Sequence, residues 1–198
     1  DEVAALITQI ASAFGRQIDA VRRLSFRDFY YQHLDLDPFT ASIDALAASL
    51  QAFTISRDGL DRDDWLDLLR THCIEPRLPA GGAFLIYDFP ASQAALARVR
   101  NDHPPVAERF ELYLGRFELA NGYHELTDAA DQRARFELDL DVRRGRGSTL
   151  PAIDERLLQA LPSMPACAGV ALGVDRLHQW LVGAENLDQV MALRFDRA

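Results

Sequence analysis

Residues 110–129, FELYLGRFELANGYHELTDA, decide the fold of this 198-residue chain. Within this stretch, residues 110–113 and 116–120 read as two short strands of alternating character. Leu114-Gly115 lies between them and is typical of a tight turn. The sequence therefore predicts an antiparallel hairpin here.

The predicted hairpin brings two acidic residues together. With a two-residue turn at Leu114-Gly115, Glu111 pairs with Glu118, and their Cβ atoms lie ~4.5–5.5 Å apart on one face. Two carboxylates so placed repel each other, and a divalent cation is the simplest way to offset this. Mg²⁺ commonly takes one or two carboxylates together with water and phosphate oxygens. The alternative is a pair of solvent-facing glutamates on an edge hairpin.

A third acid, Glu125, follows Glu118 at an odd spacing, which places the two on opposite faces of a regular strand. Asn121-Gly122 is a natural place for a bulge that resets the alternation. With that bulge, Glu118, Asn121 and Glu125 line one pocket. Without it, Glu125 is an ordinary residue at a strand end. His124 taken alone is expected to be packed or exposed rather than catalytic.

Residues 169–176, GVALGVDR, form the third informative segment. Small residues at Gly169, Ala171 and Gly173 let a ligand approach the backbone closely. Arg176 follows in the first turn of a helix, where a guanidinium suits a phosphate or an adenine face. The alternative is a tightly packed central strand with Arg176 paired to Asp175 or another acid. The glycines match neither a GxGxxG nor a Walker pattern.

The remaining pattern predicts an α+β fold, because strands are grouped rather than alternating regularly with helices. Residues 83–89 and 168–174 read as further strands and residues 20–25 as an extended piece. We expect one domain over residues 1–198, with residues 1–82 a mainly helical insert and residues 83–198 an antiparallel sheet. The predicted helices span residues 4–14, 26–34, 40–50, 61–73, 92–99, 129–146, 154–161, 175–181 and 186–191.

Composition excludes several classes of function. The chain has 30 acidic and 21 basic residues, a formal net charge of -9, so no nucleic-acid partner is expected. Every basic residue is arginine, which excludes a lysine nucleophile or Schiff base. Two cysteines give neither a disulfide framework nor a zinc signature. No apolar run approaches the ~20 residues of a membrane span and no signal peptide is visible, so we expect a cytoplasmic protein without a membrane partner.

Taken together, the segments resemble the catalytic domain of class II aminoacyl-tRNA synthetases of the lysyl type. Residues 117–129, followed by Gln132-Arg133 and Arg135-Phe136, resemble the strand that carries amino-acid and ATP contacts, and residues 169–176 resemble motif 3. Residues 89–93 (FPASQ), 120–129 (ANGYHELTDA) and 194–198 (RFDRA) are similar to one branch, the synthetase-like elongation factor P–(R)-β-lysine ligases. Ala171 also favours this branch, because lysyl-tRNA synthetases usually have glycine there. The resemblance covers nearly the whole chain, most specifically residues 84–198.

The resemblance implies ATP-dependent activation of (R)-β-lysine and its ligation to a lysine of elongation factor P, by a parent enzyme that is a homodimer. An acidic pocket suits a diamino acid, since a buried ammonium needs a carboxylate partner. No catalytic residue is assigned. The implied roles are Mg²⁺ binding for Glu111 and Glu118, ATP binding for Glu118, Leu119 (through its backbone), Gly173 and Arg176, and binding of β-lysine or lysine for Asn121, Tyr123, Glu125 and Ala171.

The chain departs from the class in one respect: we find neither motif 1 nor motif 2, and the chain starts at Asp1 where motif 2 would just have ended. We therefore expect an incomplete class II domain, either a fragment of a longer ligase or a short paralogue, that is inactive on its own. Two other hypotheses remain open. One is the C-terminal half of a lysyl-tRNA synthetase, and the other is a non-catalytic binding module on the same fold.

Overall fold

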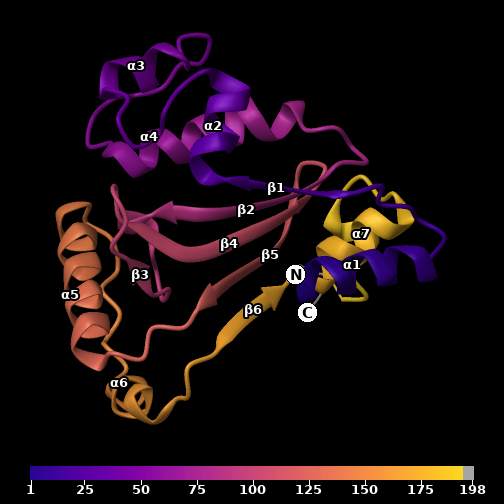
Figure 1. The fold of residues 1–198 in the computed structure, drawn as a ribbon. Coiled ribbons are helices and arrows are strands. Elements are labelled where there is room, and N and C mark those ends of the chain that lie inside the picture. The colour runs from indigo at the N-terminus through magenta and orange to yellow at the C-terminus, as the bar shows by residue number, and fades with distance from the viewer. Residues whose placement is uncertain (194–198) are drawn as a thin grey trace.

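A six-stranded sheet organises the computed structural model, which describes residues 1–193 (Figure 1). The strand order is β1-β2-β4-β5-β6, and β3 pairs with β4 outside this path. β1 is parallel to β2, and the other pairings are antiparallel. The predicted α+β fold is therefore confirmed, with one parallel pair in place of a purely antiparallel sheet. The strands are β1 (Val21–Ser25), β2 (Ala83–Pro90), β3 (Val99–Arg100), β4 (Val106–Leu114), β5 (Phe117–His124) and β6 (Ala168–Leu172).

The helices gather in three places around the sheet. In Figure 1, α2, α3 and α4 lie together above β1, α1 and α7 lie together at one end of the sheet, and α5 and α6 lie at the other end. Several are capped by a side chain at the first position: Ser25 caps α2, Asp61 caps α4 and Asp128 caps α5. The α-helices are α1 (Glu2–Ala13), α2 (Phe26–Leu34), α3 (Ile43–Ala48), α4 (Arg62–Leu69), α5 (Ala129–Gly145), α6 (Glu155–Ala160) and α7 (Val174–Val182).

Each face of the sheet has its own apolar core. One core joins side chains of α2 and α4, such as Tyr30 and Leu66, to Ile86 and Tyr113 of the sheet. The other core joins Ile7 of α1 and Leu177 of α7 to residues that include Leu85, Leu112 and Leu114. Because strand side chains alternate between faces, Glu111 and Tyr113 belong to the face of α2–α4, and Leu112 belongs to the face of α1 and α7.

Three predicted helices differ from the structure. The helix predicted over residues 92–99 is wrong: a single 3₁₀ turn (Ala91–Gln93) is followed by Ala95 at a φ of 49° and then by β3, whose Val99 pairs with Ala107. Sheet pairing overrides a short helical pattern here. The helix predicted over residues 40–50 is shorter, since Ser42 rather than Thr40 caps α3. The helix predicted over residues 186–191 is reduced to a 3₁₀ turn (Leu187–Gln189).

Residues 194–198, part of the resemblance described above, lie outside the described residues. Among residues 1–193, no helix is both long enough and apolar enough to cross a membrane.

Candidate nucleotide and substrate site

The β4–β5 hairpin exists, but its register differs from the prediction. Leu114 pairs with Phe117 and Tyr113 with Glu118, so the turn falls at Gly115 and Arg116. Gly115 has a φ of 54°, a conformation that glycine adopts without strain in a tight hairpin turn. The predicted pairing of Glu111 with Glu118 is therefore wrong, because Glu111 pairs with Asn121.

A bulge corrects the alternation along β5. Tyr113 faces Glu118 and Leu112 faces Ala120, so Leu119 is the extra residue. The bulge predicted at Asn121-Gly122 is thus misplaced, yet its expected consequence holds: Glu118 and Asn121 share the face that Glu111 occupies. Strand alternation also puts Tyr123 on this face, and Glu125 follows it.

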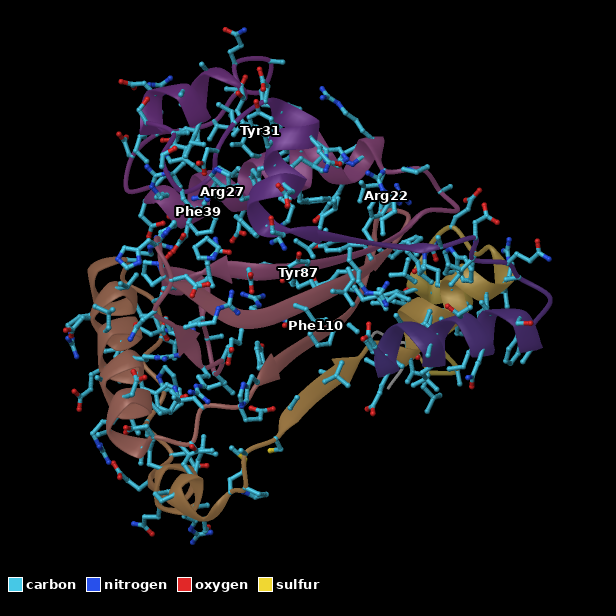
Figure 2. All side chains as sticks on the ribbon, in the orientation of Figure 1. Arg22, Arg27, Tyr31, Phe39, Tyr87 and Phe110 are labelled. Atoms are coloured by element: carbon cyan, nitrogen blue, oxygen red, sulfur yellow. The ribbon has the colours of Figure 1, made fainter. Side chains whose placement is uncertain are left out.

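Gly122 serves a different purpose, because it makes room for an aromatic ring on the other face of the sheet. A Cβ on Gly122 would lie 2.5 Å from the ring of Phe110, which Figure 2 labels on β4. The two residues are paired across β4 and β5.

Glu111 lies buried, with 2% of its surface exposed, so the alternative of a solvent-facing glutamate pair is wrong. Its Oε1 accepts a hydrogen bond from Arg109 Nη2 at 2.5 Å. Its Oε2 accepts from Arg70 Nη1 and from the hydroxyl of Tyr113, each at 2.7 Å. Two guanidinium groups therefore neutralise Glu111, as a buried carboxylate requires.

Arg109 connects this carboxylate to Asn121, one of the predicted substrate residues. Its Nε donates to Asn121 Oδ1 at 3.3 Å and its Nη1 donates to the carbonyl of Gln93 at 2.9 Å. Its guanidinium also lies 4.5 Å from the centre of the Phe89 ring. The sequence did not single out Arg109, because the predicted strand begins at residue 110; β4 begins earlier, at Val106, and strand alternation then puts Arg109 and Glu111 on one face.

A pocket of about 380 Å³ lies where β5, β6 and the start of α7 meet. The Gly173 N–H donates to the carbonyl of Leu119 at 2.7 Å, and Arg176 Nη1 donates to the carbonyl of Glu118 at 2.8 Å. Arg176 is therefore held by a backbone carbonyl of β5 and not by Asp175. The residues that line the pocket are Glu118, Leu119, Ala120, Asn121, Ala171, Leu172, Gly173, Asp175, Arg176 and Leu187.

The carboxylate of Glu118 is half-buried at the edge of this pocket. Burial raises its pKa, the negative charge of Glu111 raises it further, and the nearby Arg70 and Arg176 oppose the shift. Within the part of the chain that the structure describes, no side chain forms a hydrogen bond or salt bridge with this carboxylate. Glu118 is therefore chemically suited to a cation.

The predicted substrate residues lie further along the same face. Asn121 pairs with Ala171, and Tyr123 pairs with Gly169. A Cβ on Gly169 would overlap Oε1 of Glu125, so the glycine seats that carboxylate against β6 rather than admitting a ligand. The pocket therefore brings Asn121 and Ala171 together with the predicted nucleotide residues, whereas Tyr123 and Glu125 do not line it.

The fit of this site to Mg²⁺ differs between the two predicted carboxylates. Among residues 1–193, no group of three or more acidic, histidine or cysteine side chains is arranged to hold a metal ion. Mg²⁺ needs no such group, since it retains waters and takes phosphate oxygens. Glu118 fits this requirement. Glu111, with both oxygens engaged by arginines, fits it only if one guanidinium withdraws.

Two other features lie apart from the site. His124 belongs to the opposite face of the sheet, where its Nδ1 lies 2.7 Å from Glu108 Oε2. A cavity of about 250 Å³, lined by Phe136, Leu140, Ile153 and neighbouring residues, lies between α5 and α6. None of the sequence-predicted site residues lines that cavity.

Comparison with known proteins places the chain in a family. A family model described as tRNA synthetases class II (D, K and N) matches residues 27–196. An elongation factor P–(R)-β-lysine ligase of Salmonella arizonae is 47% identical over 179 residues, which cover 88% of this chain and 55% of that protein. A Klebsiella pneumoniae protein of the same name is 45% identical over the same shares of the two chains. The chain therefore spans about half the length of the curated relatives it matches, and it belongs to the class II tRNA synthetase family.

Proposed function

We propose that this chain supplies the ATP and amino-acid site of an elongation factor P–(R)-β-lysine ligase. The observation that carries the proposal is the pocket at β5, β6 and α7, which gathers Glu118, Asn121, Ala171, Gly173 and Arg176. Its volume of about 380 Å³ lies within the ordinary range for small-molecule sites. The relatives that bear this enzyme's name match 88% of the chain.

The nucleotide side of the proposed site uses Arg176, Gly173, Leu119 and Glu118. Arg176, anchored to the Glu118 carbonyl, presents a guanidinium for a phosphate or the adenine face. Gly173 and Leu119, joined backbone to backbone, form a wall that a flat base can approach. Glu118 would hold Mg²⁺, with Glu111 behind it, and this ion would supply positive charge to the phosphates.

The amino-acid side uses Glu125, Asn121, Tyr123 and Ala171. Glu125 would pair with an ammonium group of the diamino acid, because burying that charge requires a carboxylate. Asn121, held by Arg109, contributes an amide beside it. The methyl group of Ala171 lies across from Asn121 and limits the space next to the substrate carbon.

The proposed chemistry has two steps. A carboxylate oxygen of (R)-β-lysine attacks the α-phosphorus of ATP, the bond to the leaving oxygen breaks, and pyrophosphate departs. The amine of a lysine of elongation factor P then attacks the acyl carbon, loses a proton and expels AMP. The residues named here contribute by positioning and charge. We place this reaction in the cytoplasm and assign it to a homodimer of the longer parent enzyme.

The direct test of this proposal is ligand binding by the 198-residue chain, measured by titration calorimetry. ATP with MgCl₂ should bind the wild type, and Arg176→Ala should weaken it by about tenfold, the value of one charge-assisted hydrogen bond. Arg156→Ala, on exposed α6, is the matched control and should bind as the wild type does. Equal affinity in all three proteins, or no binding to the wild type, would contradict the proposal.

A further inference from the structure

Arg70 is the less firmly held of the two arginines that neutralise Glu111. Its Nη1 donates to Glu111 Oε2 at 2.7 Å and lies 2.9 Å from the hydroxyl of Tyr113. Its Nη2 donates to Asp67 Oδ1 at 3.0 Å, and the Asp67 side chain is 56% exposed. Its Nε is buried without a hydrogen-bond partner and lies 3.9 Å from Glu75 Oε1. One of its donors is thus unsatisfied in the present arrangement.

Arg109, by contrast, uses all three of its guanidinium nitrogens as hydrogen-bond donors. It projects from the central strand β4, and besides Glu111 it contacts Asn121, the carbonyl of Gln93 and the ring of Phe89. Moving it would break all of these contacts. Arg70 projects from a π-helical turn (Arg70–Ile74), an irregular segment rather than a strand. If one of the two guanidinium groups releases Glu111, it is therefore that of Arg70.

Arg70 also has acidic groups to receive it. Three acids other than Glu111 lie close enough to feel the charge of Arg70. This charge opposes the rise in the pKa of Asp67, Glu75 and Glu118. Asp67 already holds one end of the guanidinium, and Glu75 lies just beyond hydrogen-bond reach of the unsatisfied Nε. A cation at Glu118 would repel Arg70 and attract the freed carboxylate of Glu111.

We propose that Arg70 is a displaceable counter-ion that neutralises Glu111 in the cation-free site and competes with a divalent cation for that carboxylate. Release of Glu111 Oε2 turns Arg70 toward Asp67 and Glu75, and it makes a second carboxylate available beside Glu118. Arg70 is therefore a positioning residue that lowers divalent-cation affinity until the site is loaded. This inference rests on the proposed function, since it assumes that Glu118 binds the cation.

The test uses Mn²⁺ alone as the probe, with free Mn²⁺ counted by electron paramagnetic resonance in the presence of the full chain. Arg70→Met should tighten Mn²⁺ binding by about tenfold, because the competing charge-assisted hydrogen bond is gone. Arg70→Lys, which keeps the charge, should remain within about threefold of the wild type. Glu111→Gln should weaken binding more in the Arg70→Met background than in the wild type. A merely structural role for Arg70 predicts weaker binding instead.

A second measurement follows the wild type and needs only the conservative Arg70→Lys variant, for assignment. The Nε–Hε resonance of Arg70, assigned with Arg70→Lys, should shift when MgCl₂ is added to the wild type, while that of Arg109 stays in place. Unchanged or weaker Mn²⁺ binding by a folded Arg70→Met, or an unmoved Arg70 resonance, would overturn the inference. If Glu118→Gln leaves Mn²⁺ binding unchanged, the cation site of the proposed function is wrong and the inference falls with it. If Glu118→Gln weakens binding but Arg70→Met does not tighten it, the inference alone fails.

Discussion

At the scale of single residues, Glu118 carries the most specific electrostatic signature of the proposed site. In the unfolded chain the pKa of this carboxyl is near 4.5. Because its pKa is higher in the folded protein, the folded protein keeps this proton up to a higher pH than the unfolded chain does. The free energy of unfolding contributed by this group is therefore greatest below pH 4.5 and is lost as the pH rises through the folded pKa.

Glu118→Gln should remove this dependence. We expect the variant to be more stable than the wild type at pH 7, because an ionised half-buried carboxylate is gone, and we expect the difference to shrink toward pH 4.5. Urea unfolding at several pH values measures it. Glu137→Gln, on the charged helix α5, is a matched control that should not change the slope. A Glu118→Gln variant that is less stable than the wild type at pH 7 would show that its carboxylate is stabilised in the folded state.

Ala171 is the residue to which we assign substrate choice. Ala171→Gly in the intact enzyme should relax selectivity toward α-lysine by ~1–3 kcal/mol, because removing one methyl group opens space beside the substrate carbon. The measurement is the ratio of kcat/KM values for the two amino acids. Ala168→Gly, three residues earlier on β6, is the control for strand flexibility. An unchanged ratio would count against this role.

At the scale of elements, the β5–β6 pair positions the site, and Gly169 tests that packing. Gly169→Ala would introduce a Cβ into the space of the Glu125 carboxylate. We expect β-lysine affinity to fall by about tenfold, since Glu125 would be moved from its ammonium partner. Gly81→Ala, where no atom lies within 4 Å, is the control. Undiminished binding by Gly169→Ala would place the ammonium away from Glu125.

The same elements show what the sequence could predict. The hairpin followed from its alternation and its turn glycine, but its register did not, because Leu114-Gly115 and Gly115-Arg116 are both plausible turns. The structure selects the second, in which Gly115 adopts a positive φ and its N–H donates to the carbonyl of Gly82. That contact comes from a loop far away in the sequence. The bulge at Leu119 likewise depends on pairing with both neighbouring strands.

The charged cluster at Glu111 was only half predictable. Sequence spacing predicts that the two glutamates lie close together and that a cation offsets their charge. In the structure, two arginines neutralise Glu111. One of them, Arg70, belongs to a helical segment 41 residues earlier in the chain. No local pattern relates the two, since tertiary packing alone brings α4 and the π-helical turn after it over this face of the sheet.

At the scale of the whole molecule, one face of the sheet bears a row of paired residues whose two ends, Tyr87 and Val170, are exposed and apolar. Tyr87 pairs with Phe110, Phe110 with Gly122 and Gly122 with Val170, so the row crosses four strands. Figure 2 labels Tyr87 and Phe110 on adjacent strands. Tyr87 is 38% exposed and Val170 is 52% exposed, and β6 is the last strand of the sheet order. Exposed apolar side chains at a sheet edge favour association between copies.

We therefore expect the 198-residue chain to self-associate through this row. Sedimentation should show an average mass above 22.2 kDa that rises with concentration. Val170→Thr, which keeps a β-branched side chain, should lower that mass. Val142→Thr, at an exposed position of α5, should leave it unchanged. A wild type that remains at the monomer mass throughout would contradict the prediction.

We propose that β5, β6 and α7 form a nucleotide site, and ATP binding measured together with pyrophosphate exchange tests this proposal. The 198-residue chain should bind ATP with MgCl₂, and Arg176→Ala should weaken that binding by about tenfold. It should not catalyse exchange between ATP and labelled pyrophosphate in the presence of (R)-β-lysine, because it spans 55% of the related ligases and its sequence shows neither motif 1 nor motif 2. Robust exchange by this chain alone, or ATP binding that is indifferent to Arg176, would contradict the account.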